Sequence, residues 1–452
     1  MTRYQIDSSW WRRSNAEGDT VVAGSPLKVF RFSSAARSLL EAVENKNEVS
    51  SGSASTVQRL LDAGAVHPVL DSMTRELQPN DVTVVIPVHN GSIEQLSMLV
   101  TKVSSAYKVL IVDDGSSPAL PDIAGAHFIR RDTAGGPAVA RNAAIEHITT
   151  EITFFLDADT SLADDSWINL LAHFSDSSTG LVAPRIASED GSTLLYRYEA
   201  SESPLDLGSE PALIRKNSRV SYVPTAALMI RTELLRKHQG FNESFRYGED
   251  VDLVWRLLES NVVCRYEPSV VVSHSPRSSL LDAWKQRVSY GSAAAPLNQK
   301  HPGAATPLRI NRWSATAWTA LATGHPLLGL TIGAGSTVAL ERKISSQPDS
   351  RTLALRLAGR GNIHAGRMIA QAIIRTWWPI AFVIALFSRR GRRVVLAAIV
   401  LPSLTNWFSK KPKVDPLTYC ALKLADDVAY GTGVWKGVIA TRDLGALAPK
   451  FD

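Results

Sequence analysis

The sequence predicts an α/β fold: a mostly parallel sheet covered by helices, with a small winged-helix-like module before it and an apolar helical region after it. Three observations carry this prediction. Uninterrupted Val/Ile/Leu runs alternate with helical patterns in the middle of the chain, short strand-like runs surround a Gly-Ser-Pro turn near its start, and charge is sparse in the last third. At 452 residues the chain is long for one core. We expect three parts, at residues 1–78, 79–305 and 306–452.

The first part contains two strand-like runs and two helical patterns. The runs are Thr20–Val22 and Lys28–Phe32, and one helix is expected to end at Val43. A second helix, Ser55–Ala63, is followed by Gly64, a common residue after a helix end. This set of elements suits a small winged-helix-like module.

The second part carries the predicted sheet. Runs of Val, Ile and Leu bounded by polar turns are typical of strands buried on both faces, and alternation with helices favours parallel pairing. In such sheets ligands bind beyond the carboxyl ends of the strands. The expected strands are Val82–Pro87, Val109–Val112, Phe128–Ile129, Thr153–Leu156 and Leu181–Ala183.

The third part is apolar and basic. No charged residue lies between Arg312 and Glu341, and two further apolar runs, Thr376–Ser388 and Val394–Phe408, flank the cluster Arg389–Arg393. The last two runs are shorter than the roughly 18 residues that a membrane span needs. Two interpretations stay open: a helical hairpin on one membrane leaflet with its arginines at anionic headgroups, or a buried helical bundle.

Bulk composition sets further limits. Hydrophobic residues make up 45% and charged residues 20%, which indicates a globular chain, and the net charge of +6 is compatible with anionic substrates or an anionic membrane face. Basic residues are otherwise scattered, which disfavours nucleic-acid binding. Cys264 and Cys420 lack metal-type spacing and are expected to be reduced. The start of the chain has no apolar secretory segment, so we expect a cytoplasmic location.

Polar residues follow the first two predicted strands. The first strand runs into His89 and Asn90, and the second ends at Asp113-Asp114-Gly115. A carboxylate at this edge can accept hydrogen bonds from a uracil imide or from ribose hydroxyls, and glycine permits a tight turn. The alternative is an ordinary Asp-Gly turn.

A Gly135-Gly136-Pro137 turn opens the next helix, with Arg141 on its first turns. A helix N-terminus with an arginine suits a diphosphate. The alternative is a surface helix whose arginine is solvated.

Two acids, Asp157 and Asp159, come directly after the very apolar strand Thr153–Leu156. On an extended chain, a spacing of two points both side chains the same way. Such a pair suits a hard cation, Mg²⁺ or Mn²⁺, that bridges a substrate diphosphate. The alternative is a pair of exposed caps for a helix near Asp164.

Glu249 and Asp250 begin an amphipathic helix after a glycine, and His274 ends a strand-like run. Asp250 is our candidate for a general base, with Glu249 positioning the acceptor or separating the two pKa values. His274 is a candidate metal ligand. The alternatives are acids placed for the helix dipole and a structural histidine.

The order of these motifs resembles family 2 glycosyltransferases with the GT-A (Rossmann-like) fold, over Val82 to about His274. The resemblance implies a nucleotide site lined by Pro87, Asp114 and Arg141. It also implies an Asp-x-Asp motif at Asp157 and Asp159, with Asp159 and His274 as metal ligands and Asp250 as catalytic base. No Gln-x-x-Arg-Trp motif is evident, which speaks against processive polymer formation; Gln286-Arg287 stands in a comparable place.

A closer similarity, to mycofactocin-system glycosyltransferases, rests on residues 22–33, 60–68 and 290–303. It implies transfer of glucose from UDP-glucose to a peptide-derived redox cofactor in β-linked units, with residues 1–78 similar to peptide-binding modules. An inverting displacement is then expected. Two alternatives remain: a membrane-associated glycosyltransferase with a lipid-linked cell-wall acceptor, and a non-catalytic scaffold that binds a sugar nucleotide and a peptide.

Overall fold

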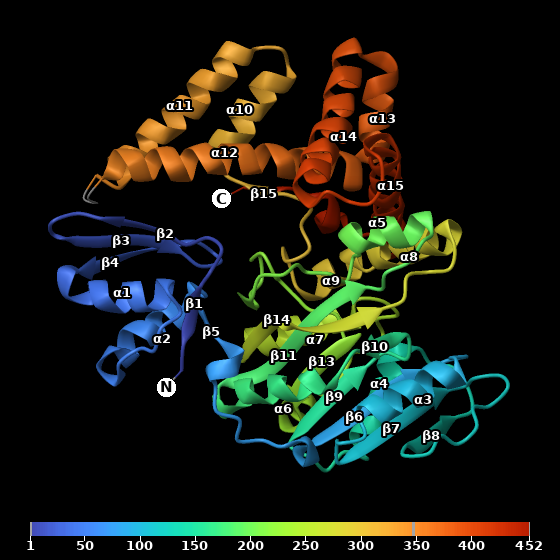
Figure 1. Cartoon of the computed structure of the whole chain (residues 1–452). Helices are drawn as coiled ribbons and strands as arrows, with labels where there is room; N and C mark the ends of the chain where they lie inside the picture. Colours follow the sequence, from blue (N-terminus) through green and yellow to red (C-terminus); the bar gives the residue numbers. More distant parts are fainter. Residues whose placement is uncertain (1, 346–348, 452) are drawn as a thin grey trace. The chain divides into compact units, whose positions relative to one another are not determined.

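The computed structural model describes residues 2–345 and 349–451 (Figure 1). Met1 and Asp452, the outer limits of the predicted first and third parts, lie outside the described residues. Contacts within the chain form two compact units. Unit 1 holds the residues up to Glu189 together with Glu202–Pro276, and unit 2 holds Asp190–Ser201 together with the residues from Arg277 onward. The limits at residues 78 and 305 stay predictions.

The N-terminal segment of unit 1 contains the predicted strands and helices. Strands β2, β3 and β4 form an antiparallel sheet, and β1 pairs with β5. The apolar faces of α1 and α2 meet around Leu40, Val43 and Leu60, all fully buried. The bounds are β1 Tyr4–Ile6, β2 Trp11–Ser14, β3 Gly18–Ala23, β4 Lys28–Ser33, α1 Arg37–Glu44, α2 Ala54–Asp62 and β5 Val66–Pro68, with short 3-10 turns at 34–36, 51–53, 70–72 and 79–81.

The large sheet of unit 1 has the strand order β10-β14-β11-β13-β9-β6-β7-β8, with β12 beside β14. All five predicted strands are present as β6, β7, β8, β9 and β11. The bounds are β6 Val82–Val88, β7 Lys108–Asp114, β8 His127–Arg131, β9 Ile152–Leu156, β10 Thr160–Leu162, β11 Thr179–Ser188, β12 Ala212–Leu213, β13 Ala227–Arg231 and β14 Val263–His274.

The sheet is mixed: six of its strands run in one direction, as expected of a mostly parallel sheet, and β10, β12 and β13 run against them. Strands β9, β6, β7 and β8 are parallel neighbours, as predicted. Strand β13 is antiparallel to both β9 and β11, and β10 is antiparallel to β14. Because helices alternate with the strands of this sheet, the fold class is α/β as predicted.

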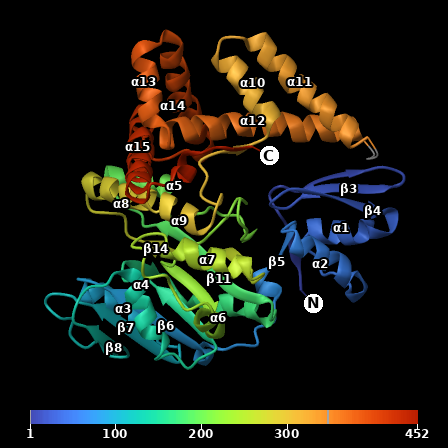
Figure 2. The ribbon, with the colours of Figure 1, turned by 180° about the vertical axis from the view of Figure 1, so that it is seen from behind.

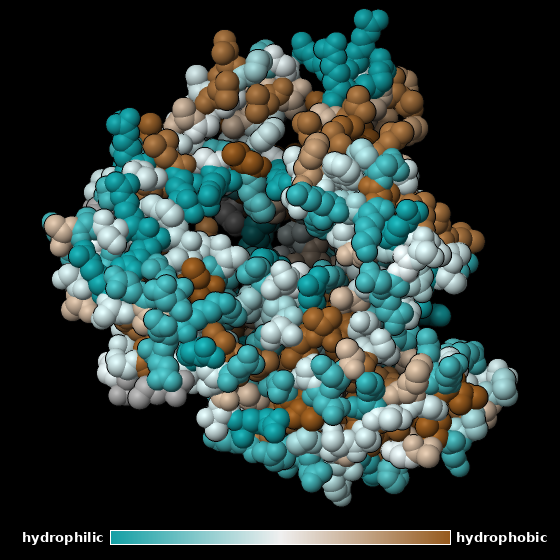
Figure 3. Space-filling model, viewed as in Figure 1, coloured by the Kyte–Doolittle hydropathy of each residue, from teal (hydrophilic) through white to brown (hydrophobic). Residues whose placement is uncertain are grey.

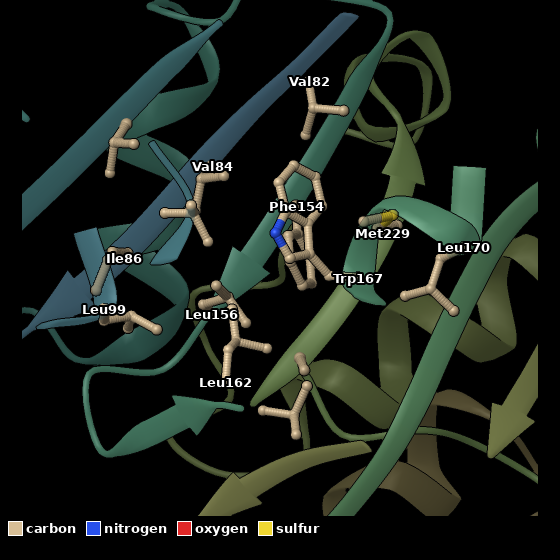
Figure 4. Close-up of a cluster of buried hydrophobic side chains, with 14 of the residues drawn as sticks. Val82, Val84, Ile86, Leu99, Phe154, Leu156, Leu162, Trp167, Leu170 and Met229 are labelled. Carbon is tan, nitrogen blue, oxygen red and sulfur yellow. The ribbon is translucent and has the colours of Figure 1, made fainter. Parts of the chain in front are cut away.

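Helices cover both faces of this sheet (Figures 1 and 2). On one face, α3 and the 3-10 helix η5 pack on β6 and β9, and Trp167 stacks on Phe154 with ring centroids 5.6 Å apart (Figure 4). On the other face, α4 and α7 cover Val85 and Phe155. The helix bounds are α3 Ile93–Lys102, α4 Pro137–Ile145, η5 Asp165–Ser175, α6 Thr232–Lys237 and α7 Glu249–Glu259.

Unit 2 is helical, as the composition of the last third predicts. No single helix among its described residues is long and apolar enough to cross a membrane, but α12 and α13 pass that test together, with a bend of 88° between them. The bounds are α5 Leu194–Glu202, α8 Leu280–Ser292, α9 Ala294–Lys300, β15 Arg309–Ile310, α10 Arg312–Ala322, α11 Pro326–Lys343, α12 Ser350–Arg375, α13 Trp378–Phe387, α14 Arg389–Lys410, α15 Pro416–Thr441, η6 Leu444–Leu447 and β16 Lys450–Phe451.

Both cysteines are free thiols, as expected. Cys264 lies in β14 in the core of unit 1, where burial raises the pKa of its thiol to about 12. Such a thiol is inert at neutral pH.

Candidate active site

The predicted site residues of unit 1 gather at one edge of the sheet. Strands β6, β7 and β9 are parallel neighbours, so their carboxyl ends meet, and Val88 pairs with Asp113 across β6 and β7. Two antiparallel steps, from β9 to β13 and from β13 to β11, restore the direction of β9, and β14 runs parallel to β11. His274, at the carboxyl end of β14, therefore lies along the same edge.

Asp113 is buried and holds the loop that follows β7. Its carboxylate accepts from the backbone N–H of Ser116 at 2.9 Å and of Leu120 at 3.2 Å, and it pairs with Arg130. Burial opposes its ionisation, yet these donors keep the pKa of Asp113 below its ordinary value. In the structure, the contacts of Asp113 therefore fix the conformation of this loop.

Asp114 holds the glycine turn that precedes α4. Its carboxylate accepts from the N–H of Gly135 at 3.0 Å and of Gly136 at 2.7 Å, and from Arg131 Nε at 2.8 Å. Gly115 packs against the same turn with φ of +71°, and a Cβ there would lie 2.6 Å from the Ala134 nitrogen. Only glycine fits this combination of backbone angle and close approach.

The segment after β6 is tied to the segment after β7. His89 Nδ1 lies 2.8 Å from the Asp114 carbonyl oxygen, and the Asn90 N–H donates to Ser116 Oγ at 2.8 Å. Asn90 Oδ1 accepts from the Ser117 N–H at 2.9 Å, and Pro87 is half-buried just before them in β6. These bonds place His89 and Asn90 beside the Asp-Asp-Gly segment.

Arg141 joins two of the predicted acids. Its guanidinium donates to Asp157 Oδ1 at 2.7 Å and to Glu249 Oε1 at 2.8 Å, and it stacks on Phe241 at 5.4 Å from the ring centroid. Its side chain is only 3% exposed. Burial alone would lower the pKa of Arg141, but the charges of Asp157 and Glu249 raise it. The interpretation of Arg141 as a solvated surface residue is therefore wrong.

Asp250 stands next to this ion-pair cluster on the first turn of α7. Burial raises the pKa of Asp250 to about 7, and the neighbouring charge of Glu249 adds to the effect. The Val251 N–H donates to its carboxylate at 2.7 Å, and Arg141 opposes the shift. A carboxyl that titrates near neutrality suits proton transfer at physiological pH.

Asp159 and His274 meet across β10 and β14. Thr160 pairs with His274 in the sheet register, and His274 Nε2 lies 3.3 Å from Asp159 Oδ1. An imidazole nitrogen and a carboxylate oxygen this close together could both reach one divalent cation. Within residues 2–345 and 349–451, no cluster of three or more His, Cys, Asp or Glu side chains is arranged to hold a metal alone. A bound substrate would have to complete such a site.

The Asp157–Asp159 segment is a turn, not an extended strand. Strand β9 ends at Leu156, and Thr160 N–H and Oγ1 both bond to the Asp157 carbonyl. The two carboxylates therefore have different partners, Arg141 for Asp157 and His274 for Asp159. The expected extended chain between Asp157 and Asp159 is wrong, because the chain turns after Leu156 to start β10.

Two further residues at this edge escaped the sequence analysis. Phe241 lies under Arg141, and Asn142 of α4 fixes it by accepting from its N–H at 2.8 Å. Glu189 bonds to Ser161 and Ser275, which flank the Asp159–His274 pair. A lone phenylalanine or a glutamate in a loop carries no distinctive local pattern, so only the tertiary structure reveals these positions.

Comparison with known proteins assigns residues 83–238 to the family model described as glycosyl transferase family 2. The chain is 39% identical, over 96% of its own length and 95% of theirs, to proteins named pre-mycofactocin glycosyltransferase from two strains of Mycobacterium tuberculosis, CDC 1551 and H37Rv.

Similarity to solved structures is weaker. GalNAc-T7 with UDP, GalNAc and Mn²⁺ matches at a TM-score of 0.35 and 16% identity, over 43% of each chain. The mannosyltransferase PcManGT from Pyrobaculum calidifontis, in complex with GDP-Man and Mn²⁺, matches at 0.36 and 16%, over 75% of this chain and 92% of that one. At these TM-scores the likeness identifies no ligand for this chain.

Proposed function

Because the chain belongs to the family 2 glycosyltransferases, in the same family as the pre-mycofactocin glycosyltransferase of Mycobacterium tuberculosis, we propose that it glycosylates mycofactocin or its precursor. The donor in this proposal is UDP-glucose, the anomeric centre inverts, and repeated transfer builds a β-linked oligosaccharide. The observation that carries the proposal is the buried Arg141, which holds Asp157 and Glu249 beside Asp250 at the carboxyl edge of the sheet.

The donor is proposed to bind along the carboxyl ends of β6 and β7. Pro87, His89 and Asn90 would contact the nucleoside from one side, and Gly115 would let the chain pass close to the base. Asp113 and Asp114 are engaged in shaping the two loops, so in this proposal they support the nucleotide site through the backbone they fix.

We propose that Asp159 and His274 hold one Mn²⁺ or Mg²⁺ ion together with the donor diphosphate. Their 3.3 Å spacing supports this proposal. Such an ion would supply positive charge to offset the charge that grows on the departing UDP. Asp157 would help by keeping Arg141 at the same edge.

Asp250 is proposed as the general base. It would accept the proton of an acceptor hydroxyl while that oxygen attacks the anomeric carbon from the face opposite UDP. The C–O bond to UDP breaks as the new glycosidic bond forms, so one displacement inverts the centre. Glu249, 9% exposed and bonded to Arg141, would hold the start of α7 and keep the pKa of Asp250 high.

Mass spectrometry of reaction products tests this proposal. The purified chain is incubated with UDP-glucose, Mn²⁺ and a mycofactocin-type acceptor, and successive additions of one hexose are expected. UDP-galactose and GDP-mannose serve as matched donors. Absence of hexose addition from UDP-glucose, with addition from another donor, would overturn the sugar assignment and leave the glycosyltransferase assignment intact.

A lipid-linked acceptor is the second candidate. The exposed apolar side chains of unit 2 favour it, because a polyprenyl acceptor lies in a membrane. A screen of peptide-derived and polyprenyl-phosphate acceptors under one set of conditions separates the two candidates. If the acceptor is peptide-derived, product should form only with the peptide-derived acceptors and not with the polyprenyl phosphates.

We also propose that residues 1–78 dock the peptide part of the acceptor, and that the reaction takes place in the cytoplasm with unit 2 at the inner face of the membrane. The module would act by raising the local acceptor concentration. Deletion of the module should therefore raise the KM for a peptide-linked acceptor and leave donor hydrolysis unchanged.

A further inference from the structure

The helices of unit 2 expose large apolar side chains that a water-soluble bundle would bury. On α13 six large apolar residues are exposed while Ala381 is buried, and Phe387 at the helix end is 87% exposed. Leu327 at the start of α11 is 78% exposed. Patches of this kind mark interaction surfaces. The large exposed apolar residues of α11, α13 and α14 are Leu327, Leu328, Leu330, Val338, Ile380, Phe382, Val383, Ile384, Leu386, Phe387, Leu396, Leu401 and Phe408.

Two turns of unit 2 lie side by side and bring together the helix ends that carry Leu327 and Phe387. Helices α13 and α14 form a hairpin around Ser388, and Arg390 at its tip donates to the Thr323 carbonyl at 2.9 Å, in the turn between α10 and α11. Gly324 of that turn also packs on the Arg390 guanidinium. The ends of α11 and α13 that carry Leu327 and Phe387 are therefore neighbours.

Positive charge borders this apolar end. Arg389, Arg390, Arg392 and Arg393 are all exposed on the first turns of α14. Arg392 donates to the Ala385 and Leu386 carbonyls at the end of α13, which fixes the cluster beside Phe387. Figure 3 shows brown, hydrophobic side chains over the α13–α14 region with teal, hydrophilic side chains at its outer end.

The charge of the surrounding sequence has one sign. Residues 350–414 contain twelve lysines and arginines and no aspartate or glutamate. An apolar protein partner alone would not call for this excess, whereas a bilayer with anionic headgroups offers both an apolar layer and negative phosphates. Nucleic acid would satisfy the charge but would leave the leucines and phenylalanines in water.

We propose that the α10–α11 turn and the α13–α14 hairpin form a surface that inserts into one leaflet of an anionic bilayer. Leu327 and Phe387 enter the acyl boundary, and Arg389 and Arg393 bind lipid phosphates. This inference rests on the proposed membrane contact of unit 2 and deepens it, because it names the lipid class and the inserting side chains.

Vesicle flotation with the full chain tests the inference. We expect binding to vesicles of phosphatidylcholine with phosphatidylglycerol, and at least tenfold weaker binding to phosphatidylcholine alone. R389E/R393E should lower the first affinity about tenfold or more, because it replaces two positive charges by negative ones at an anionic surface. F387N/L327N should lower it at both low and high salt.

Control variants in unit 1 make the same change of charge or remove a single exposed apolar residue. R59E/K237E carries the same change in net charge, and Met98→Asn removes another apolar residue that is 56% exposed. Both should bind like the unaltered chain. Equal flotation of all variants, or no flotation with either vesicle, would overturn the inference. It would also be overturned if R389E/R393E lost binding to RNA while its binding to vesicles stayed unchanged.

Failure of this surface is distinguishable from failure of the proposed activity. R389E/R393E should transfer sugar to a soluble acceptor at the rate of the unaltered chain without vesicles. Asp250→Asn should float normally while transfer is lost. Loss of both properties in either variant, with unfolding excluded by circular dichroism, would contradict the separation of the two surfaces.

Discussion

The sheet of unit 1 buries its apolar side chains and gathers acids at one edge, whereas helices α11 to α14 of unit 2 expose apolar side chains beside basic ones. Phe155 of β9 is fully buried against Phe241, with ring centroids 5.2 Å apart, while Phe382 of α13 is 57% exposed. Both lie in runs that look equally apolar in sequence. The difference shows that an apolar run in the sequence does not by itself say whether its side chains are buried in the protein core or exposed on its surface.

The largest effect is expected from removing one acid, Asp250, at the carboxyl edge of the sheet. Asp250→Asn removes the proposed base and should lower kcat by about a thousandfold or more, since general bases contribute roughly 10² to 10⁴ in rate. UDP-glucose should still bind, as measured by calorimetry. Glu259→Gln, on the last turn of the same helix, is the control and should keep full activity. Unaltered turnover of Asp250→Asn would remove this residue from the base role.

The next effect sharpens the contrast between buried and exposed rings. Phe155→Ala should lower the free energy of unfolding by about 3–5 kcal/mol, because it deletes a buried ring and leaves a cavity. Phe382→Ala should change it by about 0.5 kcal/mol at most, as at other exposed positions. Urea denaturation of both variants measures the difference. Equal losses would mean that α13 is packed in solution.

Metal removal tests the Asp159–His274 pair. EDTA should lower transfer about a hundredfold, with recovery on addition of Mn²⁺ or Mg²⁺, since the charge of an ion at a departing phosphate is worth several kcal/mol. His274→Ala should need more metal for recovery, while Asp122→Asn, an exposed acid elsewhere in unit 1, should not. Full activity in EDTA would count against the metal proposal.

A smaller effect concerns pH. The pKa of Asp250 is raised to about 7, so the carboxylate is protonated at lower pH and cannot accept a proton. The value of kcat/KM should fall about tenfold per pH unit below that value and level off above it. A Glu249→Gln variant removes the neighbouring charge that helps to raise the pKa and should move the inflection to lower pH. An unmoved inflection would assign the titration to another group.

Sequence predicted the strands and much of the edge because both have local signals. The runs Val82–Pro87 and Thr153–Leu156 are apolar on both faces, and acids that follow parallel strands meet at one edge. The antiparallel insertion of β13 had no such signal, since a five-residue apolar strand pairs equally well in either direction. The fold-back after Leu156 also went unseen, and it separates Asp157 from Asp159 by giving them different partners.

The roles of Asp113 and Asp114 show the same limit from another side. Their place at the end of a strand was predictable. The backbone N–H groups that donate to their carboxylates, however, lie in loops up to 22 residues away. Which carboxylate faces a ligand and which holds a loop depends on those loops. Pattern and spacing specify the residue types near a site, while hydrogen-bond partners emerge only when the chain is folded.

Asp114 has one more consequence. Its carboxylate accepts hydrogen bonds from the Gly135 and Gly136 N–H groups and so fixes the loop before α4. In the proposed nucleotide site, a ligand at this loop would bind a segment that the fold already orders, so its association would carry a smaller entropic cost. The conformation of this loop would then be set by the fold, and ligand binding would not need to induce it.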